Sequence, residues 1–158
     1  MNEAVARLLF ISRKMIFDDP IYDTHRQLDE LQNDAKLIRE QVFIHEQQIA
    51  VEDEWDAEDA IALHFVVLDQ HQPIATARLL NNNSVGRVAV LKEYRGKGIG
   101  RLLMLEIIQQ AKHQQREFLK LSAQVHAIAF YESLGFKVQG DEYLDCGIPH
   151  VDMRLLFA

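Results

Sequence analysis

The stretch Val85–Gly100 places the tightest constraint on this chain, because it runs from a strand through a glycine-rich turn directly into a helix. β-Branched and apolar residues predict the strand over Val85–Leu91. An apolar-periodic pattern predicts the helix over Gly98–Gln115. The turn between them, Arg95–Gly100, reads RGKGIG. A strand, a glycine-rich turn and a helix in this order can bind an anion.

The turn offers both backbone and side-chain groups to an anion. Gly96, Gly98 and Gly100 carry no Cβ, so the backbone can adopt positive φ values and approach a ligand closely. A helix that begins here leaves its first N–H groups without partners and places roughly half a positive charge at its start, which suits a phosphate or pyrophosphate. Cationic side chains surround the same point: Arg95, Lys97 and Arg101.

Two common phosphate-binding motifs do not fit the turn. The Walker motif needs Lys-Ser/Thr at its end, whereas Arg101 and Leu102 follow Gly100 and offer no hydroxyl for Mg²⁺. The dinucleotide-binding motif needs the spacing G-x-G-x-x-G, which the three glycines of this turn do not have. The pattern therefore disfavours a kinase-type or Rossmann-type enzyme.

Length and charge limit the classes of protein to which the chain can belong. The chain has 158 residues, a formal net charge of −7 and one cysteine, Cys146. This length suits a single domain over residues 1–158, and the acidic charge argues against a nucleic-acid partner. A lone cysteine agrees with a reducing compartment. Since no apolar run has the length of a membrane span, we expect a cytoplasmic protein without a membrane partner.

The remaining elements follow from local patterns and turn residues. We expect a helix that is capped by Asp23 or Thr24 and extends to Phe43–Gln47, and a short helix over Gln124–Phe136 that ends at Gly135. The expected strands are Ala4–Phe17, His64–Leu68, Ile74–Leu80, Glu117–Ala123, Lys137–Leu144 and Val151–Phe157. The second and third of these form an antiparallel hairpin, and Cys146–His150 forms the turn between the last two.

The segment Glu52–Asp59 carries six carboxylates in eight residues. A solvated acidic loop is the commoner explanation for such a run of charge, although Trp55 in its middle favours a more specific role. The spacing does not match an EF-hand, because no glycine occupies the turn position of the loop. We therefore predict no structural metal.

Several motifs together resemble one known family. The turn RGKGIG after a strand reading RVAV, and the later pattern A-x-x-F-Y-E-x-L-G-F that ends at Phe136, are similar to the coenzyme A motifs of the GNAT superfamily of N-acetyltransferases. The run E-W-D-x-x-D with His64, and G-I-P-H-x-x-M from Gly147 to Met153, resemble a bacterial subgroup of YjcF-like and ElaA-like proteins. The resemblance covers roughly Arg39 to the end of the chain.

The resemblance implies both a fold and a reaction. The fold is α/β (α+β), a single GNAT domain with a mixed, mostly antiparallel twisted sheet of six to seven strands, flanked by helices and splayed at the central strands. The reaction is transfer of an acetyl group from acetyl-coenzyme A (acetyl-CoA) to a small-molecule or peptide amine by direct attack in a ternary complex. The family also implies a homodimer formed through the last strands.

The resemblance further assigns the cofactor to particular residues. The pyrophosphate lies on the glycine turn, the pantetheine arm runs along the preceding strand, and the Tyr131 phenol donates a proton to the departing thiolate. His126 stands where many relatives have Asn. The implied cofactor-binding residues are Val88, Ala89, Val90, Arg95, Gly96, Lys97, Gly98, Ile99, Gly100, Arg101, His126 and Tyr131.

The acceptor amine needs a base, because a primary amine with a pKa of about 10.4 is almost wholly protonated at pH 7. An acidic pocket attracts such a cation but also raises its pKa. Glu46, Asp56 and His64 are the candidates for binding the acceptor, and we favour Glu46 as the base because it lies at the helix end expected to flank the cleft. Cys146 lacks visible activation, and we interpret it as structural.

Two other functions remain open at this point. A GNAT fold can also serve as a non-catalytic sensor or interaction module that binds an acyl-CoA. Alternatively, the turn RGKGIG can belong to a protein that binds a nucleotide phosphate. Stabilisation by ATP rather than by acetyl-CoA would indicate the second of these.

Overall fold

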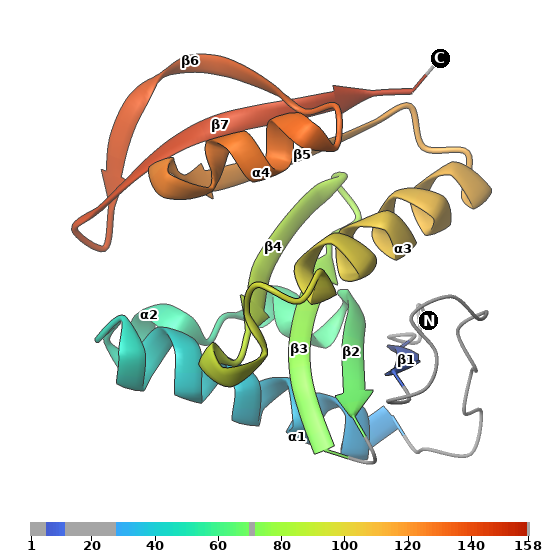
Figure 1. Ribbon diagram of the computed structural model, residues 1–158, viewed down its shortest axis with the longest axis vertical. Helices are drawn as coiled ribbons and strands as arrows, with labels where there is room; N and C mark the ends of the chain where they lie inside the picture. The colour runs from blue at the N-terminus through green and yellow to red at the C-terminus, as the bar shows by residue number, and fades with distance from the viewer. Residues whose placement is uncertain (1–5, 12–27, 70–71, 158) are drawn as a thin grey trace.

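A seven-stranded mixed sheet forms the centre of the molecule, with the strand order β1-β2-β3-β4-β5-β7-β6 (Figure 1). The structure is a computed structural model, and it describes residues 6–11, 28–69 and 72–157. The strands are β1 (Ala6–Ile11), β2 (Leu63–Asp69), β3 (Gln72–Leu79), β4 (Ser84–Val90), β5 (Phe118–Gln124), β6 (Lys137–Asp145) and β7 (Ile148–Leu156). The β1–β2 and β4–β5 pairs are parallel, and the other pairs are antiparallel.

Helices lie on both faces of the sheet (Figure 1). They are α1 (Leu28–Arg39), which continues as a π-helical segment (Glu40–Glu46), α2 (Val51–Glu54), α3 (Ile99–His113) and α4 (Ile128–Ser133). Short 3₁₀ turns lie at Ala57–Ala60, Lys92–Tyr94 and Val125–Ala127. In the part of the chain that the structure describes, no helix is long and apolar enough to cross a membrane.

Strand β2 shows why both faces need a cover. Phe65 and Val67 belong to the core cluster that includes α3, whereas Val66 and Leu68 pack in a second cluster with α1. Successive strand residues point to opposite faces, so a run without polar alternation predicts a strand that is buried on both sides. All four of these side chains are fully buried.

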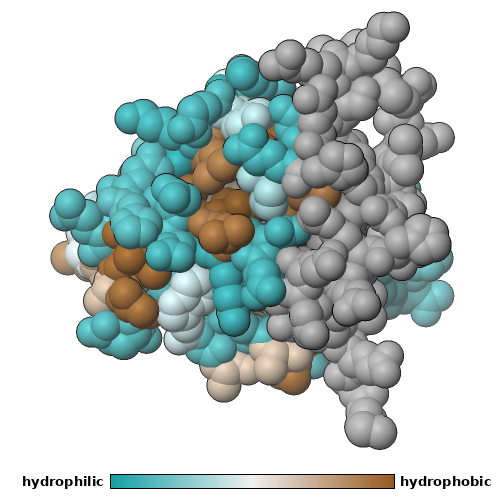
Figure 2. Space-filling model, turned by 90° about the horizontal axis from the view of Figure 1, so that it is seen from below, coloured by the Kyte–Doolittle hydropathy of each residue, from teal (hydrophilic) through white to brown (hydrophobic). Residues whose placement is uncertain are grey.

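Seen from the side on which α1 lies in Figure 1, the molecule shows small hydrophobic patches within a largely hydrophilic face (Figure 2). The α1 residue Leu37 is 58% exposed, while Ala35 and Ile38 on the same helix are buried against the sheet. Helix α1 therefore buries one stripe and leaves the other in solvent, as an amphipathic helix does.

The sheet opens between β4 and β5. These strands pair only at Ser84 with Lys120 and at Val85 with Leu121. On its other side β4 has a bulge against β3, where the register shifts and Arg87 takes a φ of +51°. A bulge bends its strand and increases the local twist, and beyond it β4 and β5 diverge (Figure 1). The predicted splay at the central strands is thus confirmed, as are the mixed sheet and its flanking helices.

Two helices differ in type from the expectations, while the expected end of the first of them near Gln47 is confirmed. The helix before the acidic segment widens into a π-helix at Glu40, and it ends where Gln48 takes a φ of +57°. The expected helix over Gln124–Phe136 is a 3₁₀ turn followed by α4. For the first strand the structure describes Ala6–Ile11; the rest of its expected range and the proposed caps lie outside the described residues.

The last turn is also shorter than expected. Cys146 and Gly147, with φ values of +50° and +76°, alone connect β6 to β7. Two residues with positive φ are typical of a tight hairpin turn. Pro149 lies inside β7 opposite Leu144, and β7 pairs with β5 only from His150 onward. The missing N–H of Pro149 therefore costs the sheet no hydrogen bond with β5.

Candidate functional site

A cavity of about 730 Å³ lies where β4 and β5 part. Its wall includes β4 from Val85 to Val90, most of the glycine turn, and the α4 residue Tyr131. Since β4 has no β5 partner after Val85, one edge of its backbone faces this cavity. The cavity therefore joins the open edge of a strand, the start of a helix and a buried phenol.

The N-terminus of α3 opens into the cavity. Gly96 and Gly98 have φ values of +74° and +80°, and Gly98 is the N-cap residue without any side-chain cap. Among the described residues, none accepts a hydrogen bond from the N–H groups of Gly98–Arg101. A buried or half-buried N–H group normally has a partner, so these amides are available to an anion.

Two of the glycines in this turn are needed for their backbone conformation. A Cβ added at Gly96 or Gly98 would meet no atom within 4 Å, so these positions need glycine for their positive φ and not for space. A Cβ at Gly100 would lie 3.6 Å from Phe130 Cζ and 3.8 Å from Val90 Cγ2, which is ordinary van der Waals contact. Gly100 therefore lies beside both β4 and α4.

The three cations of the turn differ in their surroundings. Arg95 donates from both Nη atoms to the Glu46 carboxylate at 2.6 Å, and from Nε to the Val90 carbonyl at 2.9 Å. Lys97 lies over the Tyr94 ring, 5.3 Å from its centroid, and is not part of the cavity wall. Arg101 is exposed at the wall, and its Nη1 lies 3.4 Å from Ser133 Oγ. Of the three, Arg101 is the one at the cavity wall that forms no ion pair with a described carboxylate.

The Tyr131 ring and backbone are held firmly, while no described residue bonds to its hydroxyl. Gly135, with a φ of +98°, lets the Phe136 and Gly135 N–H groups donate to the carbonyls of Tyr131 and Glu132, which closes α4. The Tyr131 ring packs edgewise on Phe130 and Phe136, with centroids 5.1 and 5.9 Å away. Among the described residues, no atom bonds to its hydroxyl, and burial raises the pKa of Tyr131 to about 12.

The structure argues against Glu46 as a general base. Its two carboxylate oxygens accept hydrogen bonds from Arg95, and this contact holds the pKa of Glu46 below its ordinary value. A base for an amine needs a raised pKa rather than a lowered one. Glu46 is also absent from the cavity wall. The expectation overlooked that the two charges, 49 residues apart in sequence, neutralise each other.

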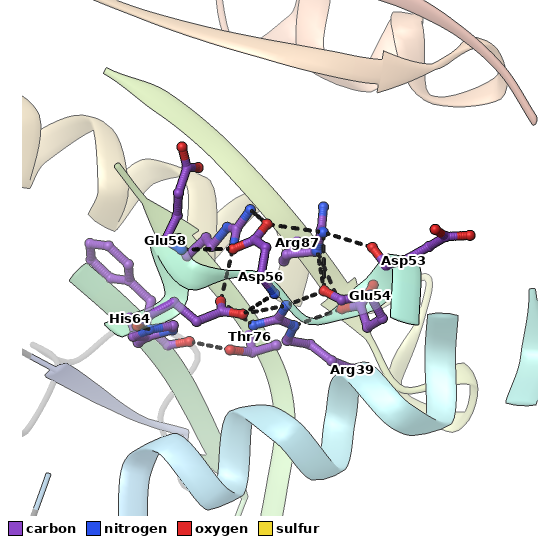
Figure 3. Close-up of polar contacts among 11 residues, drawn as sticks. Arg39, Asp53, Glu54, Asp56, Glu58, His64, Thr76 and Arg87 are labelled. Atoms are coloured by element: carbon purple, nitrogen blue, oxygen red, sulfur yellow. Dashed lines mark hydrogen bonds and ion pairs between the residues drawn. The ribbon is translucent and has the colours of Figure 1, made fainter. Parts of the chain in front are cut away.

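The acidic segment is not simply a solvated loop, because arginines from three other elements pair with Glu54, Asp56 and Asp59 (Figure 3). Arg39 Nε donates to Glu54 Oε1 at 2.7 Å and Nη1 to Asp59 at 2.6 Å, and Arg39 also lies 4.7 Å from the Trp55 ring centroid. Arg78 donates to both oxygens of Asp56, at 2.7 and 2.9 Å. The bulge residue Arg87 donates to the Glu54 carbonyl at 3.1 Å.

Asp56 and His64, which we expected to bind the acceptor, belong to this cluster and not to the cavity wall. Asp56 caps the following 3₁₀ turn, and the hydrogen bonds from Arg78 lower its pKa. His64 is buried with Nε2 2.7 Å from the Asp59 carbonyl, and burial lowers its pKa. Both residues stabilise the segment that leads from α2 to β2.

The cavity wall contains residues that the sequence did not single out. Gln47 and Gln124 exchange hydrogen bonds, the shorter at 3.0 Å, and so connect the end of the π-helix to the end of β5. His150 lines the cavity with Nδ1 2.7 Å from the Ile148 carbonyl. Cys146 is exposed at the wall rather than structural. His150 lay within the G-I-P-H motif, whereas isolated glutamines offer no sequence signal.

Known proteins resemble this chain over most of its length. Residues 28–157 match the family model of the acetyltransferase (GNAT) domain. The uncharacterised N-acetyltransferase YjcF of Bacillus subtilis (strain 168) is 34% identical over 79% of this chain and 92% of its own.

Solved structures agree with the match. The crystal structure of Escherichia coli ElaA superposes with a TM-score of 0.73 at 27% identity, covering 84% of this chain and 93% of that one. A Bacillus anthracis acetyltransferase solved in complex with acetyl coenzyme A has a TM-score of 0.54 at 25% identity, covering 61% of this chain and 62% of that one. Together with the splayed sheet and the open start of α3, these matches show that the chain belongs to the GNAT acetyltransferase family.

Proposed function

We propose that this protein is an acetyl-CoA-dependent N-acetyltransferase, which moves an acetyl group to a primary amine by direct attack in a ternary complex. One observation carries the proposal. A single cavity joins the amides at the start of α3 to the hydroxyl of Tyr131, and no described residue bonds to either. Family membership supports the same reaction class.

The residues at the wall fit coenzyme A. The free N–H groups of Gly98–Arg101, aided by the exposed Arg101, suit the pyrophosphate. Leu91 N–H donates to the Ile74 carbonyl on β3, whereas the Val90 carbonyl accepts from Arg95 on the cavity side. Val88 shares the orientation of Val90 because strand residues alternate, so both can pair with the amides of the pantetheine arm.

Acetyl-CoA supplies the acetyl group as a thioester. A β4 N–H that faces the thioester carbonyl would stabilise the charge that develops on its oxygen, and losing such a donor typically costs about 10²–10³ in rate. Tyr131 then acts on the sulfur side. With a pKa of about 12 its phenol stays protonated at neutral pH, so it donates a hydrogen bond to the departing sulfur.

His150 replaces Glu46 as our candidate for the general base. Its Nδ1 lies 2.7 Å from a backbone carbonyl, which accepts and cannot donate, so Nδ1 carries the hydrogen. In the neutral ring Nε2 is then left with a lone pair. The imidazole stacks on Tyr143 with centroids 6.1 Å apart, which fixes its orientation. Nε2 can take a proton from an amine directly or through one water.

The test combines binding with single-turnover transfer. Acetyl-CoA binding is measured by calorimetry, and transfer to a panel of primary amines is followed by mass spectrometry. We expect tight binding and an acetylated amine with release of free coenzyme A. Tight binding without transfer to any amine would instead identify a non-catalytic acyl-CoA sensor, and thermal stabilisation by ATP but not by acetyl-CoA would identify a nucleotide-binding protein.

The role of His150 is tested separately. His150→Gln keeps a hydrogen-bonding side chain but removes the titrating nitrogen. We expect it to lower kcat and to remove the acidic limb of the pH–rate profile while leaving acetyl-CoA affinity unchanged. An unchanged pH profile would exclude His150 as the base.

A further inference from the structure

A second cavity of about 360 Å³ adjoins the first. The two share the wall residues Val85, Gly86, Leu121 and Ser122, which lie where β4 and β5 part. The shared residues place the two cavities next to each other, so one molecule with two ends could occupy both.

Two of the cations that line the second cavity, Lys120 and Arg154, form no ion pair with a described carboxylate, whereas Arg78 pairs with Asp56 and Asp59. Lys120 on β5 stands directly opposite Arg154 on β7, and both line the cavity. Lys137 on β6 stands opposite Arg154 on its other side, so three cations form one row across three strands. Among the described residues, no carboxylate forms an ion pair with any of them. Like charges directly opposite one another destabilise a sheet, so this row favours a bound anion.

The remaining polar groups of the wall favour the same ligand. Arg78, only 5% exposed, keeps its Nε buried without a hydrogen-bond partner, and a Cβ at Gly86 would lie 3.9 Å from that nitrogen. Ser84 adds a hydroxyl to the wall. Asp152 is the acidic residue there, and it accepts a hydrogen bond from the Tyr143 hydroxyl at 2.7 Å.

We propose that this second cavity binds an anionic group of the acceptor, a carboxylate or a phosphate, while the acceptor's amine reaches into the first cavity. The acceptor is then an amine that also carries an acid, such as an amino acid or an aminoalkyl phosphate. Charge-assisted hydrogen bonds from Lys120 and Arg154 hold the acid. This inference rests on the proposed acetyltransferase function.

The test compares acceptors in matched pairs that differ only in the acid. An amino acid is compared with its amide, and an aminoalkyl phosphate with the corresponding amino alcohol. We expect the acidic member of at least one pair to have a kcat/KM about 10- to 100-fold higher, as charged hydrogen bonds predict. The pair with the larger ratio of kcat/KM values shows whether the cavity prefers a carboxylate or a phosphate.

Variants then assign the preference to the cavity. Lys120→Gln/Arg154→Gln is expected to remove the preference mainly through KM, with acetyl-CoA affinity unchanged. Lys36→Gln/Lys112→Gln removes two exposed charges outside both cavities and is the matched control. If the double variant does not fold, the single variant Lys120→Gln is used instead, and we expect it to reduce the preference for the acidic acceptor by less. A preference for neutral or dicationic amines, or one that the double variant retains, would overturn the inference.

A binding measurement separates this inference from the proposed function. Acetate and inorganic phosphate are titrated into the coenzyme A complex, and amide NMR shifts are followed at Lys120, Ser122 and Arg154. We expect saturable shifts in the wild type and none in the double variant. If no amine is ever acetylated but these shifts occur, the transferase proposal fails and the anion site stands. If transfer occurs without these shifts, the anion site fails alone.

Discussion

The acidic segment Glu52–Asp59 and the glycine turn Arg95–Gly100 are the two most conspicuous stretches of the sequence, and the structure treats them in opposite ways. In the acidic segment, the carboxylates of Glu54, Asp56 and Asp59 meet arginines of the same chain. In the turn, the amides at the start of α3 meet no described acceptor.

The difference shows that the role of a polar group depends on whether the chain itself supplies its partner. Buried polar groups in folded proteins are nearly always satisfied. Where the chain supplies the partner, as Arg39 does for Glu54, the group stabilises the fold. Where it does not, as at Gly98–Arg101, the group is left for a ligand. The following predictions test each side of this comparison, beginning with the largest effect.

The largest expected effect is the loss of stability when the ion pair between Arg39 and Glu54 is broken. The Arg39 and Glu54 side chains are 3% and 2% exposed, and Arg39→Met leaves a buried carboxylate with less compensation. We expect the free energy of unfolding to fall by about 3–5 kcal/mol, measured by urea denaturation. Lys36→Met, on the exposed side of the same helix, is the control and should change it by less than about 0.5 kcal/mol. If Arg39→Met lowers the free energy of unfolding by no more than Lys36→Met does, the arginine pairs do not stabilise the segment Glu52–Asp59.

Removing the Tyr131 hydroxyl, to which no described residue bonds, should lower activity without lowering stability. Tyr131→Phe deletes a hydroxyl to which no described residue bonds, so the free energy of unfolding should stay the same or rise. Turnover should fall about 100-fold, as loss of a group that assists the leaving atom predicts. Stopped-flow transfer and thermal unfolding are measured on the same sample. Full activity, or a clear loss of stability, would assign Tyr131 to the core alone.

The paired carboxylates should also show in the pH dependence of stability. Burial opposes ionisation of Asp59, but Arg39 and Arg78 outweigh it and lower its pKa from 3.8 to about 2. Because the folded pKa is the lower one, Asp59 stabilises the fold above pH 4 and loses this effect as the pH falls toward 2. The contribution is on the order of 2 kcal/mol.

The comparison of wild type with Asp59→Asn isolates this effect. Unfolding free energies of both proteins are measured between pH 2 and pH 7. The difference between them should be largest above pH 4 and shrink toward pH 2. A difference that stays constant over this range would show that the arginines do not set the ionisation of Asp59.

The smallest expected effect concerns the backbone of the turn. Gly98→Ala forces an alanine into a φ of +80°, at a cost of about 1 kcal/mol. Gly140→Ala, at +83° and outside both cavities, imposes the same strain and is the matched control. Only Gly98→Ala should also weaken coenzyme A binding in calorimetry, by about fivefold. Equal coenzyme A affinities in the two variants would show that the glycine turn does not bind the cofactor.

Local patterns predicted much of the fold. The strand that contains Phe65–Leu68, the helix α3 and the closing turn at Gly135 follow from periodicity and from glycine conformation, which act over a few residues. The cavity residues of the turn and of β4 followed from a motif of contiguous residues. The structure places all of them on one wall except Lys97.

The predicted acceptor residues that the structure does not place at the cavity share one physical feature. Glu46, Asp56 and His64 were candidates because their partners could not be seen, and those partners lie on other elements. Pairing across the fold depends on tertiary distance, which neither composition nor spacing contains. The same holds for the π-helical widening at Glu40 and for the unassigned cations Lys120 and Arg154, which only the strand register brings together.

Amide NMR during a titration with coenzyme A tests the comparison most directly, because one spectrum reports both stretches. We predict large, saturable shifts at Gly98, Ile99 and Gly100, whose N–H groups have no described acceptor. We predict none at Asp56–Asp59, where the Asp56 and Asp59 carboxylates already pair with arginines and the Glu58 and Asp59 amides already donate within the segment. Shifts at Asp56–Asp59 with an unchanged glycine turn would contradict the account.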